Sequence, residues 1–288
     1  MKYIVVTGAS GGIGFETVRY LLEKGFYVFG SVRTGADAAK LAGLFPRNFT
    51  PLIFDVTDEA AMSAAAEQVK AMLGEQNLAG LVNNAGMVVT GPILHMPKEK
   101  MRQQFEVNTF GPLVLCQLYF PLLRSRDGKP PGRIVNVSSL SAEIALPFMG
   151  PYSASKRALS NLAHALRREF YPYGIPVIDI LPGRVKTGIV DTLAVNASDF
   201  SGTDFEEGMT RYLDSAQYLR DRGLSPEVVA ATIYRALSDA SPRLRYVRPY
   251  KYFSRWKIPV NLPTRVLDRL LAKRLRLLPG FLKNKNTL

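Results

Sequence analysis

Short apolar runs rich in β-branched residues recur along the chain and alternate with longer amphipathic stretches. The runs read "YIVV", "YVFGSV", "PLIFDV", "GLVNN", "RIVNVS" and "PVIDIL", at residues 3–6, 27–32, 51–56, 80–84, 133–138 and 176–181. Hydrophobicity within them is continuous rather than alternating, which is typical of strands that are covered on both faces of a parallel sheet. We therefore interpret the six runs as buried strands.

The stretches between the strands predict helices near residues 12–24, 58–74, 98–125 and 153–171. Ser225 and Pro226 suit the N-cap and first position of a later helix, and "RLRYV" at 243–247 adds a seventh strand. This alternation predicts a doubly wound α/β (Rossmann) fold, with about seven parallel strands and helices on both faces. We expect residues 1–247 to form this domain and residues 248–288 to form an extension.

Composition narrows the class of protein. The chain has 288 residues, of which 47% are hydrophobic, so it is long enough to bury one substantial core. Cys116 is its single cysteine, which excludes an intrachain disulfide. The chain starts directly on a predicted strand and contains no apolar run of roughly 18 residues, so we expect a cytoplasmic protein without a cleaved signal or a spanning helix.

A glycine-rich turn, "TGASGGIG" at residues 7–14, joins the first strand to the first helix. Glycines in this position permit a tight turn, close approach of the backbone to a phosphate, and close contact between helix and strand, while the helix N-terminus offers free N–H groups. The pattern predicts dinucleotide binding. The residues expected to contact the cofactor here are Gly8, Ser10, Gly12, Ile13 and Gly14.

The end of the second strand, "GSVRTG", bears on which dinucleotide binds. Arg33 stands where a cation accommodates the 2′-phosphate of NADP, whereas an NAD-binding protein places a carboxylate on the ribose. NADP(H) is therefore the preferred cofactor. Asp37 lies close enough in the sequence to leave NAD(H) open.

Tyr152 and Lys156, in "PYSASK", share one face of the predicted helix 153–171. Such a pair on its own is typical of a solvated helix surface. Proton exchange by a phenol near neutrality requires lowering its pKa by roughly three units, or about 4 kcal/mol of preferential stabilisation of the phenolate. A neighbouring ammonium and an oxidised nicotinamide together supply positive charge for this purpose.

Several further motifs occur in a fixed order with the glycine turn and "YSASK". They are "NNAG" at 83–86, "VNVSS" at 135–139 and "PGRVKTG" at 182–188. Over about residues 3–247 this combination resembles the short-chain dehydrogenase/reductase family. Within it, "LPF" shortly before Tyr152 is most similar to the hydroxysteroid and retinol dehydrogenases.

The resemblance implies roles for individual residues. Tyr152 is the proton donor and acceptor, Ser139 holds the substrate oxygen, and Lys156 tunes the phenol and binds the nicotinamide ribose. Asn108, in "VNTFG", holds a water in a proton relay, although a purely structural role stays open for it. No metal is expected. Further implied cofactor contacts are Asp55, Val56, Asn84, Ala85, Gly86, Pro182, Gly183 and Thr187.

The motifs together predict an NADP(H)-dependent oxidoreductase that interconverts a carbonyl and a secondary or primary alcohol. Residues 186–224 are the expected substrate lid, and their apolar side chains favour a hydrophobic, steroid-, retinoid- or lipid-like substrate. The lid lacks clustered Lys and Arg, which argues against a highly anionic substrate. A 3-oxoacyl-carrier reductase and a non-catalytic NADP-binding scaffold are the two alternatives.

Charge is concentrated in the C-terminal segment. Residues 243–288 contain thirteen Lys and Arg against one acid, Asp268, and thus carry +12 of the chain's net charge of +13. Residues 264–278 form an amphipathic helical pattern. Such a segment suits an anionic membrane surface, and packing on its own domain or on a second subunit is equally open; nucleic acid is the least favoured partner.

Overall fold

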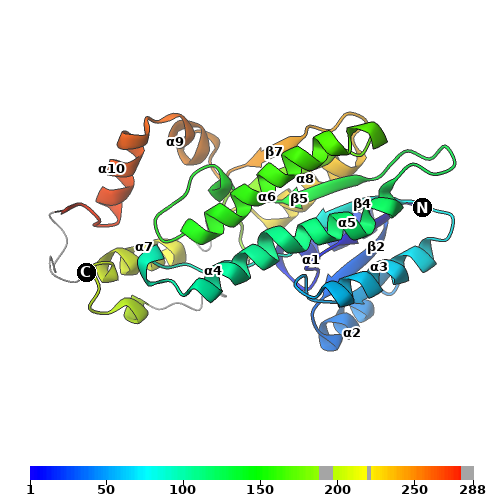
Figure 1. Cartoon of the computed structure of the whole chain (residues 1–288), viewed down its shortest axis with the longest axis horizontal. Coiled ribbons are helices and arrows are strands. Elements are labelled where there is room, and N and C mark those ends of the chain that lie inside the picture. Colours follow the sequence, from blue (N-terminus) through cyan, green and yellow to red (C-terminus); the bar gives the residue numbers. More distant parts are fainter. Residues whose placement is uncertain (188–196, 219–221, 280–288) are drawn as a thin grey trace.

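A seven-stranded, all-parallel sheet forms the centre of the computed structural model, which describes residues 1–187, 197–218 and 222–279. The strand order is β3-β2-β1-β4-β5-β6-β7, and β2, β4, β5 and β7 are labelled in Figure 1. The strands are β1 (Tyr3–Val6), β2 (Tyr27–Val32), β3 (Phe49–Ile53), β4 (Leu78–Asn83), β5 (Arg133–Val137), β6 (Val177–Pro182) and β7 (Arg245–Arg248). The predicted doubly wound fold is confirmed. Its order reverses between β1 and β4, where open α/β sheets bind their ligands.

Helices cover both faces of the sheet. Those described are α1 (Gly12–Glu23), α2 (Gly35–Leu44), α3 (Glu59–Leu73), α4 (Lys98–Phe105), α5 (Gly111–Leu123), α6 (Gly150–Glu169), α7 (Glu206–Tyr218), α8 (Pro226–Ser238), α9 (Ile258–Asn261) and α10 (Thr264–Arg274). The N-cap of α8 is Ser225, which accepts a hydrogen bond from the Glu227 N–H, and Pro226 follows it. Both assignments made from the sequence are confirmed.

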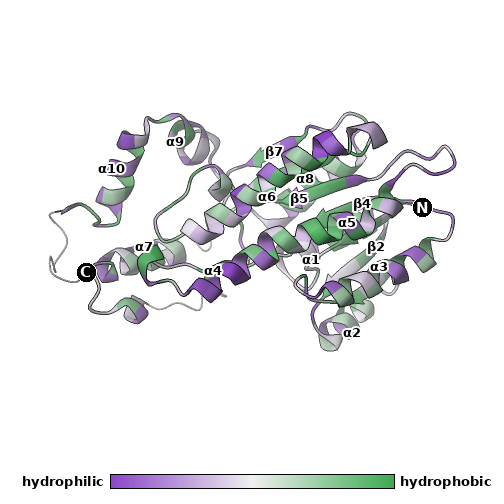
Figure 2. Ribbon diagram, in the orientation of Figure 1, coloured by the Kyte–Doolittle hydropathy of each residue, from purple (hydrophilic) through white to green (hydrophobic). Residues whose placement is uncertain are grey.

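The continuous apolar runs arise because successive strand residues enter different cores. In β1, Ile4 and Val6 belong to the core beneath α1, α2 and α8, whereas Val5 belongs to the core beneath α3, α5 and α6. All three side chains are fully buried. Figure 2 shows the strands as mainly hydrophobic ribbons, between helices in which hydrophobic and hydrophilic residues are mixed. Burial on both faces therefore removes the polar alternation that a half-exposed strand would have.

Three local features depart from the helices expected from the sequence. The expected helix 98–125 is α4 and α5 joined by a π-helical turn, Glu106–Phe110. Helix α2 was not expected; its N-cap Thr34 accepts a hydrogen bond from the Asp37 N–H. Helix α7 also forms where the sequence suggested irregular structure. The remainder of the expected lid, 188–196 and 219–221, lies outside the described residues, as do residues 280–288 of the extension.

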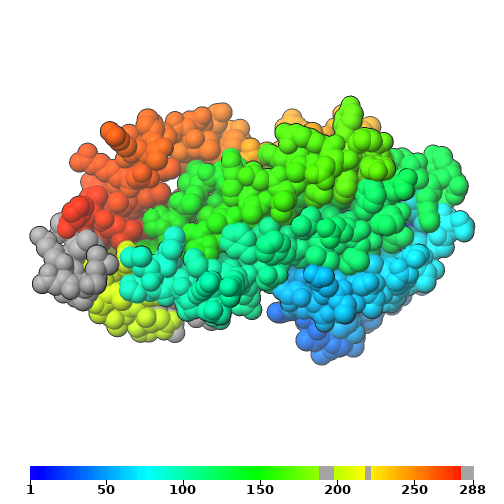
Figure 3. Space-filling model, in the orientation of Figure 1, coloured from blue at the N-terminus to red at the C-terminus, as the bar shows by residue number. Residues whose placement is uncertain are grey.

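The C-terminal extension packs beside α7 at the end of the molecule remote from the N-terminus (Figures 1 and 3). Leu275, just past α10, joins Met209 of α7 and Phe148 in a small apolar core. Packing on its own domain, one of the alternatives left open by the sequence, is therefore observed for one face of this segment.

The glycine turn depends on the absence of a side chain at Gly14. A Cβ at this position would lie 2.0 Å from the Gly8 carbonyl oxygen and 2.6 Å from the Asn84 amide nitrogen. At Gly11, three residues earlier, a Cβ would meet no atom within 4 Å. We expect Gly14→Ala to lower the free energy of unfolding by about 3 kcal/mol and Gly11→Ala to change it little. Urea denaturation of both variants checks this, and equal losses would contradict the steric explanation.

Candidate active site

The glycine turn between β1 and α1 is fastened to the end of β4. Thr7 Oγ1 accepts hydrogen bonds from the backbone N–H groups of Asn84 and Ala85, both at 2.9 Å. The Asn84 side-chain amide donates to the Thr7 carbonyl at 2.8 Å. Gly8 occupies the left-handed region, with φ of 67°. These contacts hold the N-terminus of α1 open toward the crevice, where its free N–H groups suit a phosphate.

A cavity of about 1620 Å³ runs along the carboxyl ends of the strands. Ser139, Tyr152 and Lys156 line it together with most of the residues expected at the cofactor. Those cofactor residues are Gly8, Ser10, Gly12, Ile13, Arg33, Asp55, Val56, Asn84, Ala85, Gly86, Pro182, Gly183 and Thr187. Gly14 and Asn108 lie behind the wall, Gly14 against the Gly8 carbonyl and Asn108 fully buried.

Ser139 stands where β5 ends and a short 3₁₀ turn, Leu140–Ala142, begins. Its backbone is extended, and its Oγ accepts a hydrogen bond from the Ser141 N–H at 3.0 Å. Tyr152 lies in the first turn of α6 and faces the same cavity. Burial raises the pKa of Tyr152, while the adjacent Ser139 hydroxyl acts in the opposite direction. The phenol is therefore protonated at neutral pH in this arrangement.

Lys156 is almost fully buried, and its ammonium is held by the main chain. Lys156 Nζ donates to the Val137 carbonyl at 2.9 Å, and the Ser138 hydroxyl donates to the Lys156 carbonyl at 3.3 Å. Burial lowers the pKa of Lys156 to about 8, and the charge of Asp179 opposes that shift. Because an ammonium loses solvation in the interior, the Val137 carbonyl and the charge of Asp179 are what keep its charged form accessible.

Asn108 lies in the π-helical turn between α4 and α5. Its Oδ1 accepts a hydrogen bond from the Met87 N–H, and its Nδ2 donates to the Met87 carbonyl, both at 2.9 Å. Nδ2 also donates to Ser155 Oγ at 3.0 Å. A Cβ at Gly86 would lie 3.2 Å from Asn108 Oδ1 and 3.4 Å from Lys156 Nζ. Asn108 thus fixes the loop after β4, and Gly86 brings it close to the lysine.

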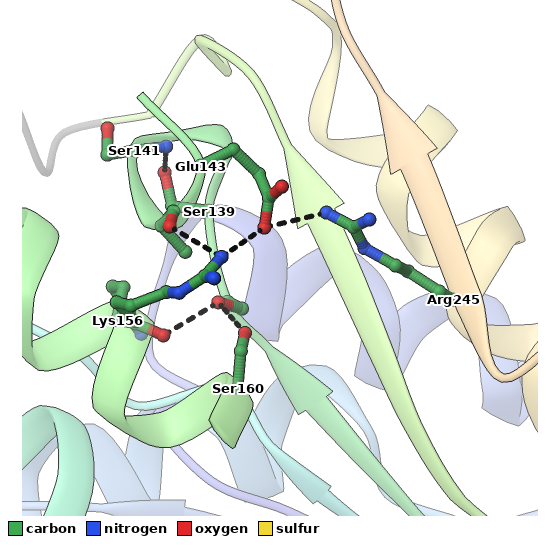
Figure 4. A network of polar contacts seen from close by, with 9 residues as sticks. Ser139, Ser141, Glu143, Lys156, Ser160 and Arg245 are labelled. Carbon is green, nitrogen blue, oxygen red and sulfur yellow. Dashed lines mark hydrogen bonds and ion pairs between the residues drawn. The ribbon is translucent and has the colours of Figure 1, made fainter. Parts of the chain in front are cut away.

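Glu143 ties the serine turn to two other elements. Its carboxylate pairs with Arg157 of α6 at 3.0 Å and with Arg245 of β7 at 2.8 Å. Figure 4 shows Glu143 beside Ser139 and directed toward Arg245. Arg157 follows Lys156 directly in the chain. The ion pairs therefore hold the turn after β5 at a fixed position relative to the helix that carries Tyr152 and Lys156.

Asp179 and Arg184 were not expected at the site from the sequence, whereas Tyr212 belongs to the expected lid 186–224 without a motif of its own. Asp179 of β6 is 2% exposed and faces Asn136 of β5 across the ladder; an acid inside the apolar run "VIDIL" was the available signal. Arg184 and Tyr212 line the cavity. Arg184 directly follows the predicted Pro182 and Gly183, while no motif points to Tyr212, which belongs to the unpredicted helix α7.

The comparisons with known proteins agree with this geometry. A family model described as "short chain dehydrogenase" matches residues 2–197. An NADPH-dependent 3-dehydrocapnine reductase from Ornithobacterium rhinotracheale is 38% identical over 277 residues, 96% of this chain and 98% of its own. A 3-ketodihydrosphingosine reductase from Bacteroides thetaiotaomicron is 29% identical, over 85% of this chain and 86% of its own.

The solved structure of a short-chain dehydrogenase from Streptomyces avermitilis superposes with a TM-score of 0.71 at 28% identity, over 86% of this chain and 87% of its own. The fold and the cavity define a dinucleotide-binding oxidoreductase. The chain belongs to the short-chain dehydrogenase/reductase family, whose members act with NAD(P). The finer similarity to hydroxysteroid and retinol dehydrogenases stays a prediction.

Asp179 gives the fold a characteristic dependence on pH. Burial raises its pKa to about 7, while the Asn136 amide, Arg167 and the Ser160 hydroxyl act in the opposite direction. The folded chain therefore binds more protons than the unfolded chain between about pH 4 and pH 7, and its stability falls as the pH rises through that window. We expect Asp179→Asn to remove this dependence, on the order of 3 kcal/mol.

The measurement is urea denaturation at pH 4.5 and pH 8 of the wild type, of Asp179→Asn and of a control, Asp268→Asn, at an exposed position on α10. The gain in stability of Asp179→Asn over the wild type should be larger at pH 8. Equal gains at both pH values would show that the carboxylate does not titrate in this window.

Proposed function

We propose that the protein reduces a ketone on an apolar, lipid-like substrate to a secondary alcohol, with NADPH as the hydride donor. The observation that carries the proposal is the convergence of Ser139, Tyr152 and Lys156 on the cavity that also receives the glycine turn. Reduced nicotinamide, when bound, supplies the hydride to the carbonyl carbon. The chain's own residues then have to orient the carbonyl oxygen and deliver a proton to it.

In this proposal Tyr152 protonates the oxygen and Ser139 orients it. Burial raises the pKa of this phenol, so it carries at neutral pH the proton that reduction consumes. Oxidation would need the phenolate, and stabilising it would require the positive charge of Lys156 together with that of an oxidised nicotinamide. Gly86 lies between Asn108 and Lys156. In this proposal Asn108 connects the site to a proton source.

Two observations support NADPH over NADH. Arg33 lines the cavity just past the end of β2. Asp37, the acid that left NAD(H) open, is engaged elsewhere, because its carboxylate accepts a 2.8 Å hydrogen bond from Thr34 in the first turn of α2. The relative from Ornithobacterium rhinotracheale is named as NADPH-dependent. The roles of Asp55, Val56 and the other expected cofactor contacts belong to the same proposal.

The substrate class follows from the cavity and from the relatives. Apolar side chains, among them Met96, Leu146, Phe200 and Leu271, line much of the cavity beyond the expected nicotinamide position. Two relatives are named as reductases of 3-dehydrocapnine and of 3-ketodihydrosphingosine. These ketones are therefore the first to test, beside a keto group on an acyl carrier.

We expect the wild type to oxidise NADPH with at least one free ketone of this group, and to use NADPH in preference to NADH. Tyr152→Phe should lower kcat about a hundredfold or more, because it removes the proton donor. Tyr171→Phe, at a residue 83% exposed, is the matched control and should leave kcat unchanged. Absorbance at 340 nm measures turnover, and NADPH fluorescence verifies that each variant binds cofactor.

Equal rates for the wild type and Tyr152→Phe would remove the phenol from the mechanism. If only the carrier-bound ketone were turned over, the substrate would be a keto group on an acyl carrier rather than a free ketone. NADPH binding without turnover of any of the three ketones would favour the non-catalytic scaffold.

We also propose that the C-terminal extension attaches the protein to an anionic membrane surface. Tyr252, Phe253, Ile258, Val266 and Leu270 are exposed apolar or aromatic residues of this segment, with Phe253 68% and Leu270 54% exposed. Exposed cations, Arg265, Arg269 and Lys273, lie among them. Among the described helices, none is both long and apolar enough to cross a bilayer. Aromatic and cationic side chains side by side suit the interface of anionic lipids.

This proposal predicts co-sedimentation with liposomes that contain phosphatidylserine, and weaker binding at high salt. Phe253→Ser combined with Leu270→Ser should lower the bound fraction several-fold, because both side chains would otherwise enter the lipid. Val228→Ser, at another exposed apolar residue, on α8, is the control. Light scattering in the absence of lipid tests the alternative that the same surface joins two chains. If the wild type is a dimer, does not bind liposomes and becomes a monomer on the double substitution, then the surface is a contact between two copies of the chain and not a membrane contact.

A further inference from the structure

Three arginines from distant parts of the sequence line the cavity near its C-terminal wall. Arg184 follows β6, Arg255 lies in the π-helical turn Phe253–Lys257, and Arg274 ends α10. The expectation that the substrate is not highly anionic rested on the lid alone. Two of these cations come from the C-terminal extension, outside the lid, and the fold brings them to the same cavity.

Arg184 is held in a defined place. Its carbonyl accepts a hydrogen bond from the Leu224 N–H at 2.9 Å, and the Lys186 N–H donates to the Leu224 carbonyl at the same distance. A Cβ at Gly223 would lie 2.9 Å from the Arg184 carbonyl oxygen, so this close strand-like contact requires glycine. Arg184 Nη1 donates to the Ala216 carbonyl of α7 at 3.1 Å, which orients the guanidinium toward the helix that forms the cavity wall.

The charges around Arg184 are mostly of its own sign. Burial lowers the pKa of Arg184, Tyr212 acts in the opposite direction, and Arg255 and Arg274 lower it further. Within residues 1–187, 197–218 and 222–279, no ion pair involves any of the three arginines. Arg184 is half-buried, whereas Arg255 and Arg274 are exposed. The repulsion between these like charges is therefore felt most by Arg184, and a bound anion would relieve it.

Tyr212 locates the arginines relative to the reacting centre. Burial raises the pKa of Tyr212 to about 12, with Arg184 lowering it and Tyr152 raising it. The Tyr212 hydroxyl donates to the sulfur of Met149 at 2.8 Å, and Met149 precedes α6. Tyr212 therefore lies against Met149, three residues before Tyr152, and its helix α7 also receives the Arg184 guanidinium through the Ala216 carbonyl.

Apolar residues continue the cavity beside these cations. Leu267, Leu271 and Leu275 of the C-terminal segment line it, and Leu275 is buried against Met209. The same wall of the cavity thus offers guanidinium groups and a leucine surface. This combination matches an amphiphile with an anionic head and an aliphatic chain.

We propose that Arg184, Arg255 and Arg274 form an oxyanion-binding subsite that recognises a sulfonate, phosphate or carboxylate on an aliphatic keto substrate. The proposal rests on the proposed ketone reduction for the identity of the reacting group. Anion binding is a separate property of the cavity, so the anion subsite and the ketone reduction can be contradicted independently of each other.

Binding is measured first, without turnover. Calorimetry on the full chain with NADP⁺ present should show that decanesulfonate binds, whereas decyltrimethylammonium binds at least tenfold more weakly. Each probe is kept below its micelle concentration. Arg184→Gln and Arg274→Gln should each weaken decanesulfonate binding by about 10- to 100-fold, the range expected for one hydrogen bond to a charged group. Arg102→Gln, at an exposed cation of α4 that does not line the cavity, is the matched control.

Kinetics then test whether the anion occupies the part of the cavity that binds the ketone. Decanesulfonate should inhibit ketone reduction competitively with the ketone, and a β-keto sulfonate should have a lower KM than the uncharged methyl ketone of equal length. The arginine variants should raise the KM for the keto sulfonate. The KM for the neutral ketone and the Kd of NADPH should stay within twofold of the wild-type values. The proposed subsite would be wrong if decanesulfonate competed with NADPH, or if the arginine variants raised the KM equally for both ketones. If calorimetry shows the expected decanesulfonate binding but no ketone is reduced, the proposed reaction is wrong and the anion subsite is still supported.

Discussion

The side chain of Lys156 crosses from α6 to the end of β5, and its ammonium donates to the Val137 carbonyl at 2.9 Å. An ammonium in the protein interior is unfavourable unless hydrogen bonds and opposite charge replace its water. Here the carbonyl accepts one hydrogen bond, and the charge of Asp179 contributes at longer range. The contact also has a geometric consequence. It holds Tyr152, one helical turn before Lys156, against Ser139, two residues after Val137.

The elements around this contact are fixed by other polar links of the same kind. Glu143 joins the turn after Ser139 to Arg157 of α6 and Arg245 of β7, and Asn108 bonds the Met87 loop to Ser155 of the same helix. The segments that follow β4 and β5 are thus joined to α6, and the turn after β5 also to β7, by side chains rather than by apolar packing alone. This rigid arrangement suits a site in which a hydroxyl and a phenol have to meet one substrate oxygen.

The C-terminal extension changes how the cavity is closed. Its inner face contributes Leu267, Leu271 and Leu275 to the cavity, while Val266 and Leu270 on its outer side are exposed. An apolar cavity wall and an exposed apolar surface thus belong to one short helix. Arg274 lines the cavity and Arg269 does not, although both side chains are exposed.

The sequence by itself determined the strands, the order of the family motifs and the expected residues of the cofactor cavity. Those features are local: a glycine turn or a continuous apolar run is recognised from neighbouring residues, and the Tyr and Lys four residues apart gained their meaning from the motifs around them. The π-helical turn at Asn108 was not predicted; it ends at Gly111, which lies so close to the Val56 carbonyl that a Cβ would be 2.5 Å away. Only the tertiary structure decided the lysine's carbonyl partner, the pairing of Glu143 with Arg157 and Arg245, and the presence of Arg184, Arg255 and Arg274 in one cavity. Each joins segments far apart in the chain, and no local pattern encodes which distant group will neutralise, bury or repel a charge.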